Sequence, residues 1–264
     1  MADFSAKDVQ NLRRLTGVGM MDAKRALTEN DGDMDKAVTW LREKGLSKAA
    51  ERADRANEQG AVSVVREGNV AAIAEINCET DFVAKSEQFT NLVEELALDV
   101  AQKGEQAVEA HKDDIDHLRI VLKENIAPGR VYRFEAPEGS VIGTYLHTQS
   151  GRGVNAVMVE LQGGDEGLAT DICHHIAFTK PQWLSRDDVP AERVEEERQV
   201  LESITRNEGK PEAALPKIVE GRLNGFFKEH VLLDQDFVKD NKVTIAKLLG
   251  GATITRFAQA AITA

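Results

Sequence analysis

One short run in this sequence, Cys173-His174-His175, combines a thiol with imidazole bases. Such a group could act as a nucleophile with a general base, or supply part of a metal site. Consecutive residues on a helix point in different directions, so Cys173 and His174 cannot form a pair there. We therefore expect a buried cysteine and partly exposed histidines on an amphipathic helix. A hydrolase or transferase that uses Cys173 or a histidine is the less favoured alternative.

The sequence lacks the short motifs that bind phosphate or carry hydrolytic chemistry. GxxxxGK[ST], HExxH, GxSxG and CxxC do not occur, and Gly163-Gly164 and Gly250-Gly251 do not form a dinucleotide fingerprint. Cys78 has no histidine near it in the sequence, and Glu195-Glu196-Glu197 is typical of a solvated surface rather than of metal ligands. We expect a protein that is not an enzyme, with no catalytic residue, no cofactor and no bound metal.

A site of another kind is indicated by Glu79-Thr80-Asp81-Phe82-Val83, which lies between an expected strand and an expected helix. Loops at such junctions often carry functional residues. Thr80 or Asp81 could cap the helix while Phe82 packs inward. Alternatively, Phe82 is exposed and acts as a wedge, with Asp81 beside it as a hydrogen-bonding anion.

Hydrophobic spacing predicts the elements that position these residues. Three short helices are expected at the start of the chain, with breaks at Thr16–Gly19 and Asn30–Asp33, and the third helix is expected to end near Gly45. Residues 47–58 are polar and charged, which is typical of a linker. We therefore predict an N-terminal helical bundle with its linker over residues 1–54.

From Gly60 onward the apolar residues recur with a period of two, which indicates strands. Strand, strand and helix then follow one another twice, and Glu75 in AAIAEI matches Glu160 in NAVMVEL. The first copy carries about nine additional residues, which include Thr80–Val83. Because the second copy lacks this segment, the comparison favours a functional role for it.

The repeat predicts an α+β fold with a two-halved core of antiparallel sheets and helices. The first half is predicted to span residues 55–139, with Pro128-Gly129 ending its last helix, and the second half residues 140–264. Two amphipathic helices joined at Gly209-Lys210-Pro211 interrupt the second half at residues 188–228 and indicate an antiparallel helical hairpin. The two seams could cover each other, which we favour slightly, or could mediate a weak homodimer.

Charge and composition restrict the classes of partner. The chain has 264 residues and a net charge of −12, whereas residues 1–58 carry 11 basic and 11 acidic side chains. An acidic chain repels phosphate backbones, so we expect no direct nucleic-acid partner. No apolar stretch is long enough to span a membrane, the N-terminus lacks the pattern of a secretory signal, and there are only two cysteines. These features favour a cytoplasmic location.

Several segments, in the same order, resemble those of the bacterial elongation factor Ts family. LRRLTGVGMMDAKRAL resembles the family's N-terminal module, a ubiquitin-associated-type three-helix bundle, and INCETDFVAKSEQF resembles its most recognisable loop. GTYLH, KPQWLSRDDVP and GKPEAALPKIVEGRLNGFFKE match later segments. The resemblance spans almost the full chain.

The resemblance implies a guanine-nucleotide exchange factor for elongation factor Tu, the GTPase that delivers aminoacyl-tRNA. It implies that Thr80, Asp81, Phe82 and Val83 dislodge magnesium in the partner, with Phe82 as the wedge. It further implies partner contacts in the N-terminal module and in the second half, by Arg13, Met20, Met21, Lys24, His147 and Val238.

Each implied contact has an ordinary structural alternative. Met20 or Met21 could belong to the core, His147 could cap the end of a strand, and Val238 could be ordinary packing. Arg13 and Lys24 could be solvated helix charges. The helical bundle alone would also fit a ribosome- or ubiquitin-associated adaptor without exchange activity, and both a one-to-one and a two-to-two complex with the partner fit the sequence.

Overall fold

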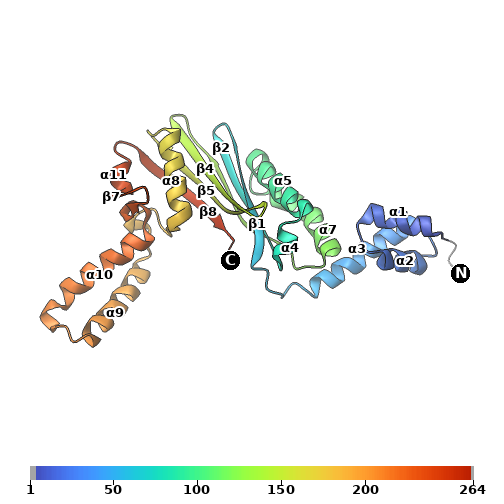
Figure 1. The fold of residues 1–264 in the computed structure, drawn as a ribbon, viewed down its shortest axis with the longest axis horizontal. Helices are drawn as coiled ribbons and strands as arrows, with labels where there is room; N and C mark the ends of the chain where they lie inside the picture. Colours follow the sequence, from blue (N-terminus) through green and yellow to red (C-terminus); the bar gives the residue numbers. More distant parts are fainter. Residues whose placement is uncertain (1–3, 263–264) are drawn as a thin grey trace.

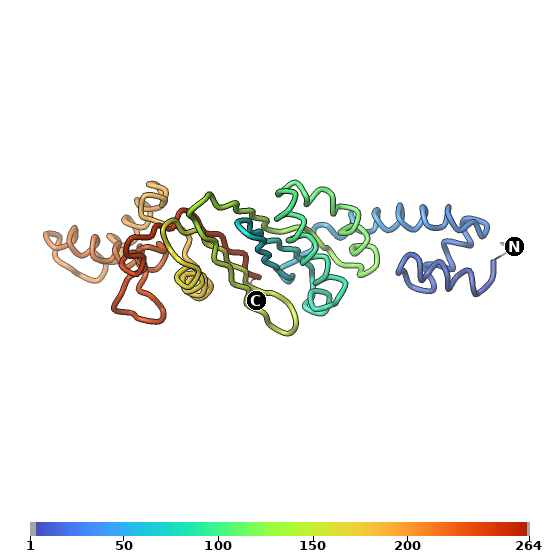
Figure 2. The backbone as a smooth tube through the Cα atoms, turned by 90° about the horizontal axis from the view of Figure 1, so that it is seen from above, coloured from blue at the N-terminus to red at the C-terminus, as the bar shows by residue number. Residues whose placement is uncertain are grey.

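The computed structural model describes residues 4–262 and confirms the α+β architecture. The molecule is elongated: a helical bundle lies at one end, two sheets covered by helices form the middle, and a helical hairpin projects from the other end (Figure 1). Seen from above, the bundle stands apart from the sheets and joins them through one long helix (Figure 2).

The bundle consists of the three predicted helices, α1 (Ala6–Thr16), α2 (Met20–Glu29) and α3 (Met34–Ala50). Asp33 caps α3, as its carboxylate accepts a hydrogen bond of 3.0 Å from the Lys36 amide. The helix does not end near Gly45 as predicted. A Cβ atom at Gly45 would lie 2.6 Å from the side chain of Ile120, so this glycine allows close helix packing rather than stopping the helix.

Two three-stranded antiparallel sheets form the middle of the molecule. The first contains β1 (Gln59–Glu67), β2 (Val70–Cys78) and β3 (Ala127–Glu135), in that order. The second contains β4 (Ser140–Gln149), β5 (Arg152–Gln162) and β8 (Thr253–Ala261), also in that order. Their apolar inner faces pack on one another through Val62, Ala71, Ile73, Phe134, Ile142, Ala156 and Met158.

Helices cover the outer face of each sheet, which gives the layers helix, sheet, sheet, helix (Figure 1). The first half carries α4 (Asp81–Ala84), α5 (Glu87–Lys103), α6 (Ala107–Ala110) and α7 (Lys112–Leu122), and the second carries α8 (Glu166–Thr179). Both halves contain the strand, strand and helix of the repeat, and in each a further strand, β3 or β8, completes the sheet. The second half has no counterpart of α4, since only residues 163–165 join β5 to α8.

The prediction that Pro128-Gly129 ends the last helix of the first half is wrong. That helix, α7, ends at Leu122, where Lys123 adopts a left-handed conformation with φ of 60°. Pro128 and Gly129 lie inside β3, beside a register shift opposite Glu75. A missing backbone donor is tolerated at such an irregularity, so the proline does not break the strand.

The predicted hairpin consists of α9 (Ala191–Asn207) and α10 (Leu215–His230), and three-residue 3₁₀ helices lie at 186–188, 212–214 and 232–234. Val189, Leu223, Phe226, Phe227 and Val231 form the buried cluster at its base. The chain returns to the second sheet through β6 (Asp236–Phe237), β7 (Asp240–Thr244) and α11 (Ile245–Leu248). Within residues 4–262, no helix is long and apolar enough to cross a membrane.

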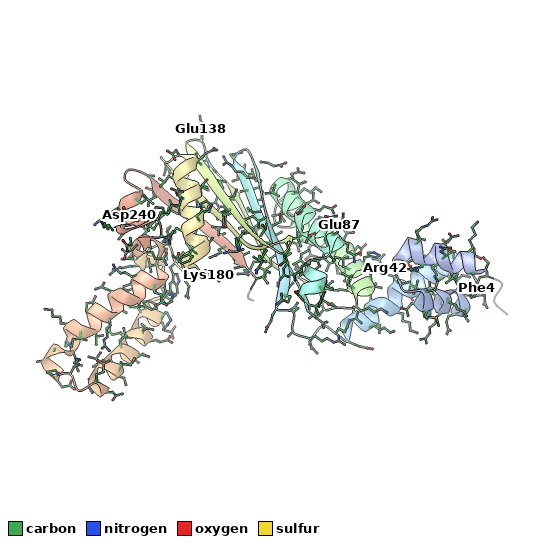
Figure 3. The ribbon with its side chains drawn as sticks, in the orientation of Figure 1. Phe4, Arg42, Glu87, Glu138, Lys180 and Asp240 are labelled. Atoms are coloured by element: carbon green, nitrogen blue, oxygen red, sulfur yellow. The ribbon has the colours of Figure 1, made fainter. Side chains whose placement is uncertain are left out.

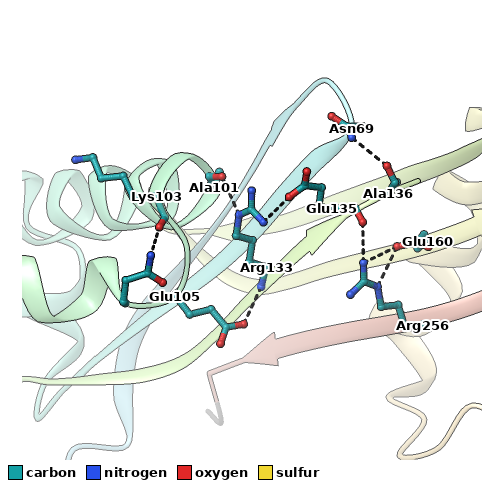
Figure 4. A network of polar contacts seen from close by, with 10 residues as sticks. Asn69, Ala101, Lys103, Glu105, Arg133, Glu135, Ala136, Glu160 and Arg256 are labelled. Carbon is teal, nitrogen blue, oxygen red and sulfur yellow. Dashed lines mark hydrogen bonds and ion pairs between the residues drawn. The ribbon is translucent and has the colours of Figure 1, made fainter. Parts of the chain in front are cut away.

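The two glutamates that revealed the repeat occupy equivalent places. Buried Glu75 pairs with Arg130 at 2.6 Å, and buried Glu160 pairs with Arg256 at 2.7 Å. Each arginine also reaches the other half. Arg130 donates to the Ala261 carbonyl at 2.6 Å. Arg256 donates to the Glu135 carbonyl at 3.0 Å, as Figure 4 shows. The repeated glutamates therefore hold two arginines that join the sheets.

Candidate partner-binding site

The side chain of Phe82 projects from the surface at the single turn of α4. Thr80 begins this turn, and its hydroxyl accepts a hydrogen bond of 3.3 Å from the Val83 amide. Val83 and Ala84 pack into the core of the first half, which leaves Phe82 on the outer side with 83% of its surface exposed. Thr80 therefore caps the helix as one alternative predicted, but the inward packing of Phe82 is wrong.

Asp81 supplies a negative charge beside the exposed ring. Its carboxylate forms an ion pair of 2.5 Å with Lys85, one turn later in the chain. The hydrogen bond from Lys85 lowers the pKa of Asp81 below its ordinary value, so the carboxylate is ionised at neutral pH. The surface of α4 thus combines a rigid apolar group with an adjacent hydrogen-bond acceptor.

The segment that joins α7 to β3 holds this turn in place through hydrogen bonds. The sequence alone did not reveal these contacts. Glu124 accepts hydrogen bonds from the Glu79 and Thr80 amides at 3.0 and 3.1 Å and from the Thr80 hydroxyl at 2.5 Å. In return, the Asn125 amide donates to the Glu79 carboxylate at 2.7 Å. More than 40 positions separate the partners in the chain, so no local pattern could have found them.

The four residues implied for the N-terminal module all have exposed side chains. Met20 is 45% and Met21 75% exposed, so neither belongs to the bundle core, which α2 supplies through Ala23, Ala26 and Leu27. Arg13 and Lys24 are exposed as well. Leu15, which lies between Arg13 and Met20 in the chain, is also 68% exposed. Its helical spacing is that of a core residue, so the sequence pattern did not indicate this exposure.

The two residues implied for the second half lie in β4 and directly after β6. His147 is exposed near the end of β4, and its Nδ1 lies 3.3 Å from the Tyr145 hydroxyl. Val238 is 41% exposed, and its amide donates to Nδ1 of His175 at 3.3 Å. Val238 is therefore only partly packed. His147 is not at the end of its strand, because two further residues of β4 follow it.

The thiol and imidazole run has no catalytic arrangement. Cys173 is fully buried, and burial raises the pKa of its thiol to about 12; Cys78 is buried, and its pKa is likewise raised to about 12. His174 is half-buried as predicted, but His175 is fully buried, since it faces Gln235 rather than solvent. Among residues 4–262, no three His, Cys, Asp or Glu side chains converge on a place for a metal ion.

The predicted residues form three surfaces rather than one cavity. The N-terminal bundle, the turn of α4 and the second sheet follow one another along the molecule (Figure 1). Arg42 of α3 pairs with Asp113 of α7 at 2.6 Å where the bundle meets the first half (Figure 3). Such a spread of exposed groups fits contact with a large partner better than a pocket for a small molecule.

Comparison with known proteins points to one family, and the similar proteins match nearly the whole chain. The family model described as "Elongation factor TS" matches residues 79–263. Proteins named "Elongation factor Ts" from Clavibacter michiganensis and Thermobifida fusca are 44% and 43% identical over 273 residues, which covers 98% and 97% of each chain. That of Deinococcus deserti is 40% identical over 95% of this chain and 97% of its own. The chain therefore belongs to the elongation factor Ts family of translation elongation factors.

Proposed function

We propose that this protein binds elongation factor Tu in its GDP form in the cytoplasm and promotes the release of GDP and its exchange for GTP. The observation that carries the proposal is the 83% exposed ring of Phe82 on a turn fixed by hydrogen bonds. An exposed phenylalanine ring leaves apolar surface in contact with water, which is unfavourable. Insertion of the same ring into a partner removes that surface from water and is favourable. The adaptor alternative is not favoured by membership of this family.

The proposed action is on the partner's magnesium ion. Magnesium requires near-ideal octahedral geometry, so a small displacement of its supporting loops weakens its binding. Phe82 inserts as the wedge, Asp81 hydrogen-bonds beside it, and Thr80 and Val83 anchor the turn. Burial of one phenylalanine favours the distorted partner by about 1.5–3 kcal/mol, which by reciprocity weakens nucleotide binding by roughly 10- to 150-fold.

The remaining binding energy comes from the other two surfaces. In this proposal the bundle of residues 1–54 binds through Arg13, Met20, Met21 and Lys24, and the second half, residues 140–264, binds through His147 and Val238. The first half, residues 55–139, presents the wedge. The three exposed surfaces lie in series, so a partner that spans them would be held while its nucleotide site is opened.

The decisive measurement is the release of a fluorescent GDP analogue from elongation factor Tu at fixed magnesium. We expect the wild-type chain to accelerate release at substoichiometric amounts, and Phe82→Ala to retain much of the binding while losing most of the acceleration. Leu98→Ala is the control, because Leu98 is a 37% exposed apolar residue of α5 outside the proposed partner contacts and should leave the rate unchanged. Exchange at the wild-type rate by Phe82→Ala would contradict the wedge.

The proposal extends to the composition of the complex. We expect no direct contact with nucleic acid, since the net charge is −12. A weak homodimer or a two-to-two complex would use apolar residues that the hairpin leaves exposed, and Val200 and Ile204 of α9 are 51% and 44% exposed. Sedimentation velocity of the complex, with Val200→Lys as the comparison, distinguishes this from a one-to-one complex.

A further inference from the structure

We propose that Glu124 is a positioning residue for the exchange reaction, which orders the turn of α4 and thereby aims Phe82. This inference rests on the proposed function. Glu124 accepts hydrogen bonds from the residues that precede Phe82, and it does so from the α7–β3 connection, 45 positions along the chain from Glu79.

The carboxylate of Glu124 fixes both the backbone and the side chain of the residue that starts α4. One oxygen accepts from two consecutive amides, Glu79 at 3.0 Å and Thr80 at 3.1 Å. The other accepts from the Thr80 hydroxyl at 2.5 Å. Hydrogen bonds to an ionised acceptor are about twice as strong as neutral ones, so this one side chain holds the entry to the turn.

The bond to the hydroxyl also determines how Thr80 caps the helix. A threonine hydroxyl has one proton, and here Glu124 accepts it. A lone pair of the same oxygen is then directed at the Val83 amide, which donates to it at 3.3 Å. The chain of contacts runs from Glu124 through Thr80 to Val83, with Phe82 between the last two residues in the sequence.

Neighbouring contacts keep Glu124 in place. Glu79 accepts from the Asn125 amide at 2.7 Å, and the Asn125 side chain donates to the carbonyls of Ala53 and Arg55 at 3.0 and 2.7 Å. Arg55 in turn pairs with Glu79 at 3.5 Å. The turn of α4, the α7–β3 connection and the linker from the bundle are therefore tied at one point, and the wedge has a rigid base.

The test is Glu124→Gln in the full chain. Glutamine keeps the shape but has only one accepting oxygen, so it cannot satisfy the two amides and the hydroxyl together. We expect hydrogen exchange of the Glu79 and Thr80 amides in the free protein to become about tenfold faster. The maximal rate of GDP release should fall about three- to tenfold, with less than about a twofold change in the concentration for half-maximal effect.

A double-mutant cycle separates positioning from general loss of structure. In a Phe82→Ala background, Glu124→Gln should add little further loss, because its effect passes through the aim of that ring. Glu138→Gln is the control: Glu138 is exposed on the β3–β4 turn, far from α4 (Figure 3). An equal loss in both backgrounds, or unchanged amide exchange in Glu124→Gln, would overturn the inference. If the wild-type chain failed to accelerate GDP release, the proposed function would fail, while amide exchange would still decide whether Glu124 orders the turn.

Discussion

At the scale of single residues, exposure separates the functional candidates from the core. Phe82 and Phe89 lie in successive helices, α4 and α5, yet Phe82 is 83% exposed while Phe89 is fully buried. The difference arises because α4 is only one turn long and its inward positions are taken by Val83 and Ala84. Single exposed apolar side chains are common on protein surfaces, so Phe82 is a candidate contact because its exposed ring stands on a turn held by hydrogen bonds.

His175 is another residue with an unusual environment, because it is fully buried and uncharged. Its Nε2 donates to the Gln235 side-chain oxygen at 2.9 Å, and its Nδ1 accepts from the Val238 amide at 3.3 Å. Gln235 is fixed in this orientation by its own bond to the Glu229 carbonyl at 2.8 Å. Both ring nitrogens are thus used by the neutral form, and protonation of Nδ1 would remove the acceptor for Val238.

This arrangement predicts a loss of stability in acid. Burial lowers the pKa of His175 in the folded protein, so the unfolded chain binds the proton first. The free energy of unfolding should therefore fall as the pH drops from about 6.5, the unfolded value, to the lower folded pKa. Urea unfolding at several pH values should show this slope in the wild-type chain and a smaller slope in His175→Gln. Equal slopes in the two proteins would disprove it.

At the scale of elements, the joint between the two sheets depends on two equivalent ion pairs. Glu160 is 4% exposed and accepts from Arg256 at 2.7 and 2.9 Å and from the Thr255 hydroxyl at 2.9 Å. Arg256 also lies over the Phe134 ring of the first half, 4.3 Å from its centroid. One arginine therefore balances a buried charge and binds the opposite half.

Removal of that arginine should destabilise the molecule strongly. Arg256→Met leaves the buried Glu160 carboxylate without its partner, and we expect a loss of about 2–4 kcal/mol in the free energy of unfolding. Arg206→Met is the control, since Arg206 pairs with Glu202 and Glu212 on the exposed surface of the hairpin, and its loss should be much smaller. Denaturant unfolding measures both, and similar losses would show that the joint has no special role.

At the scale of the whole molecule, the N-terminal bundle is nearly independent of the rest. Its core is formed by residues between Phe4 and Leu41, and Ile120 of α7 is the one described residue from outside the bundle that packs on it. Two largely exposed ion pairs connect the bundle to α7 and to the residue that follows it, Arg42–Asp113 and Asp22–Lys123. Exposed pairs of this kind contribute little, so the long helix α3 carries most of the connection.

Deletion of residues 1–54 should accordingly weaken the complex without abolishing exchange. The remaining chain keeps both sheets, their covering helices and the turn of α4, while it loses the surface around Met20 and Met21. We expect a higher concentration for half-maximal GDP release with a measurable maximal rate, after circular dichroism has shown that the core is folded. Complete loss of binding by a folded core would instead favour the adaptor alternative.

Local spacing along the chain was enough to predict much of this fold. Helical and strand periods predicted the three-helix bundle, the strands of both halves and the hairpin, because each is a pattern of neighbours along the chain. The repeat around Glu75 and Glu160 predicted two related halves, and the additional segment of the first half led to Thr80–Val83. Motif resemblance added the family, which the comparisons confirmed.

Features that depend on contacts between distant residues became visible only in the packed structure. It decided that Gly45 packs against Ile120 instead of ending α3, and that Pro128-Gly129 lies in a strand beside Glu75. It showed that Phe82 is exposed to solvent and that Glu124 accepts a hydrogen bond from Glu79, shortly before the turn. Glu79 and Glu124 are more than 40 positions apart, so local periodicity carries no sign of this contact. Burial and long-range hydrogen bonds are properties of the packed chain, and the sequence specifies them only through the fold as a whole.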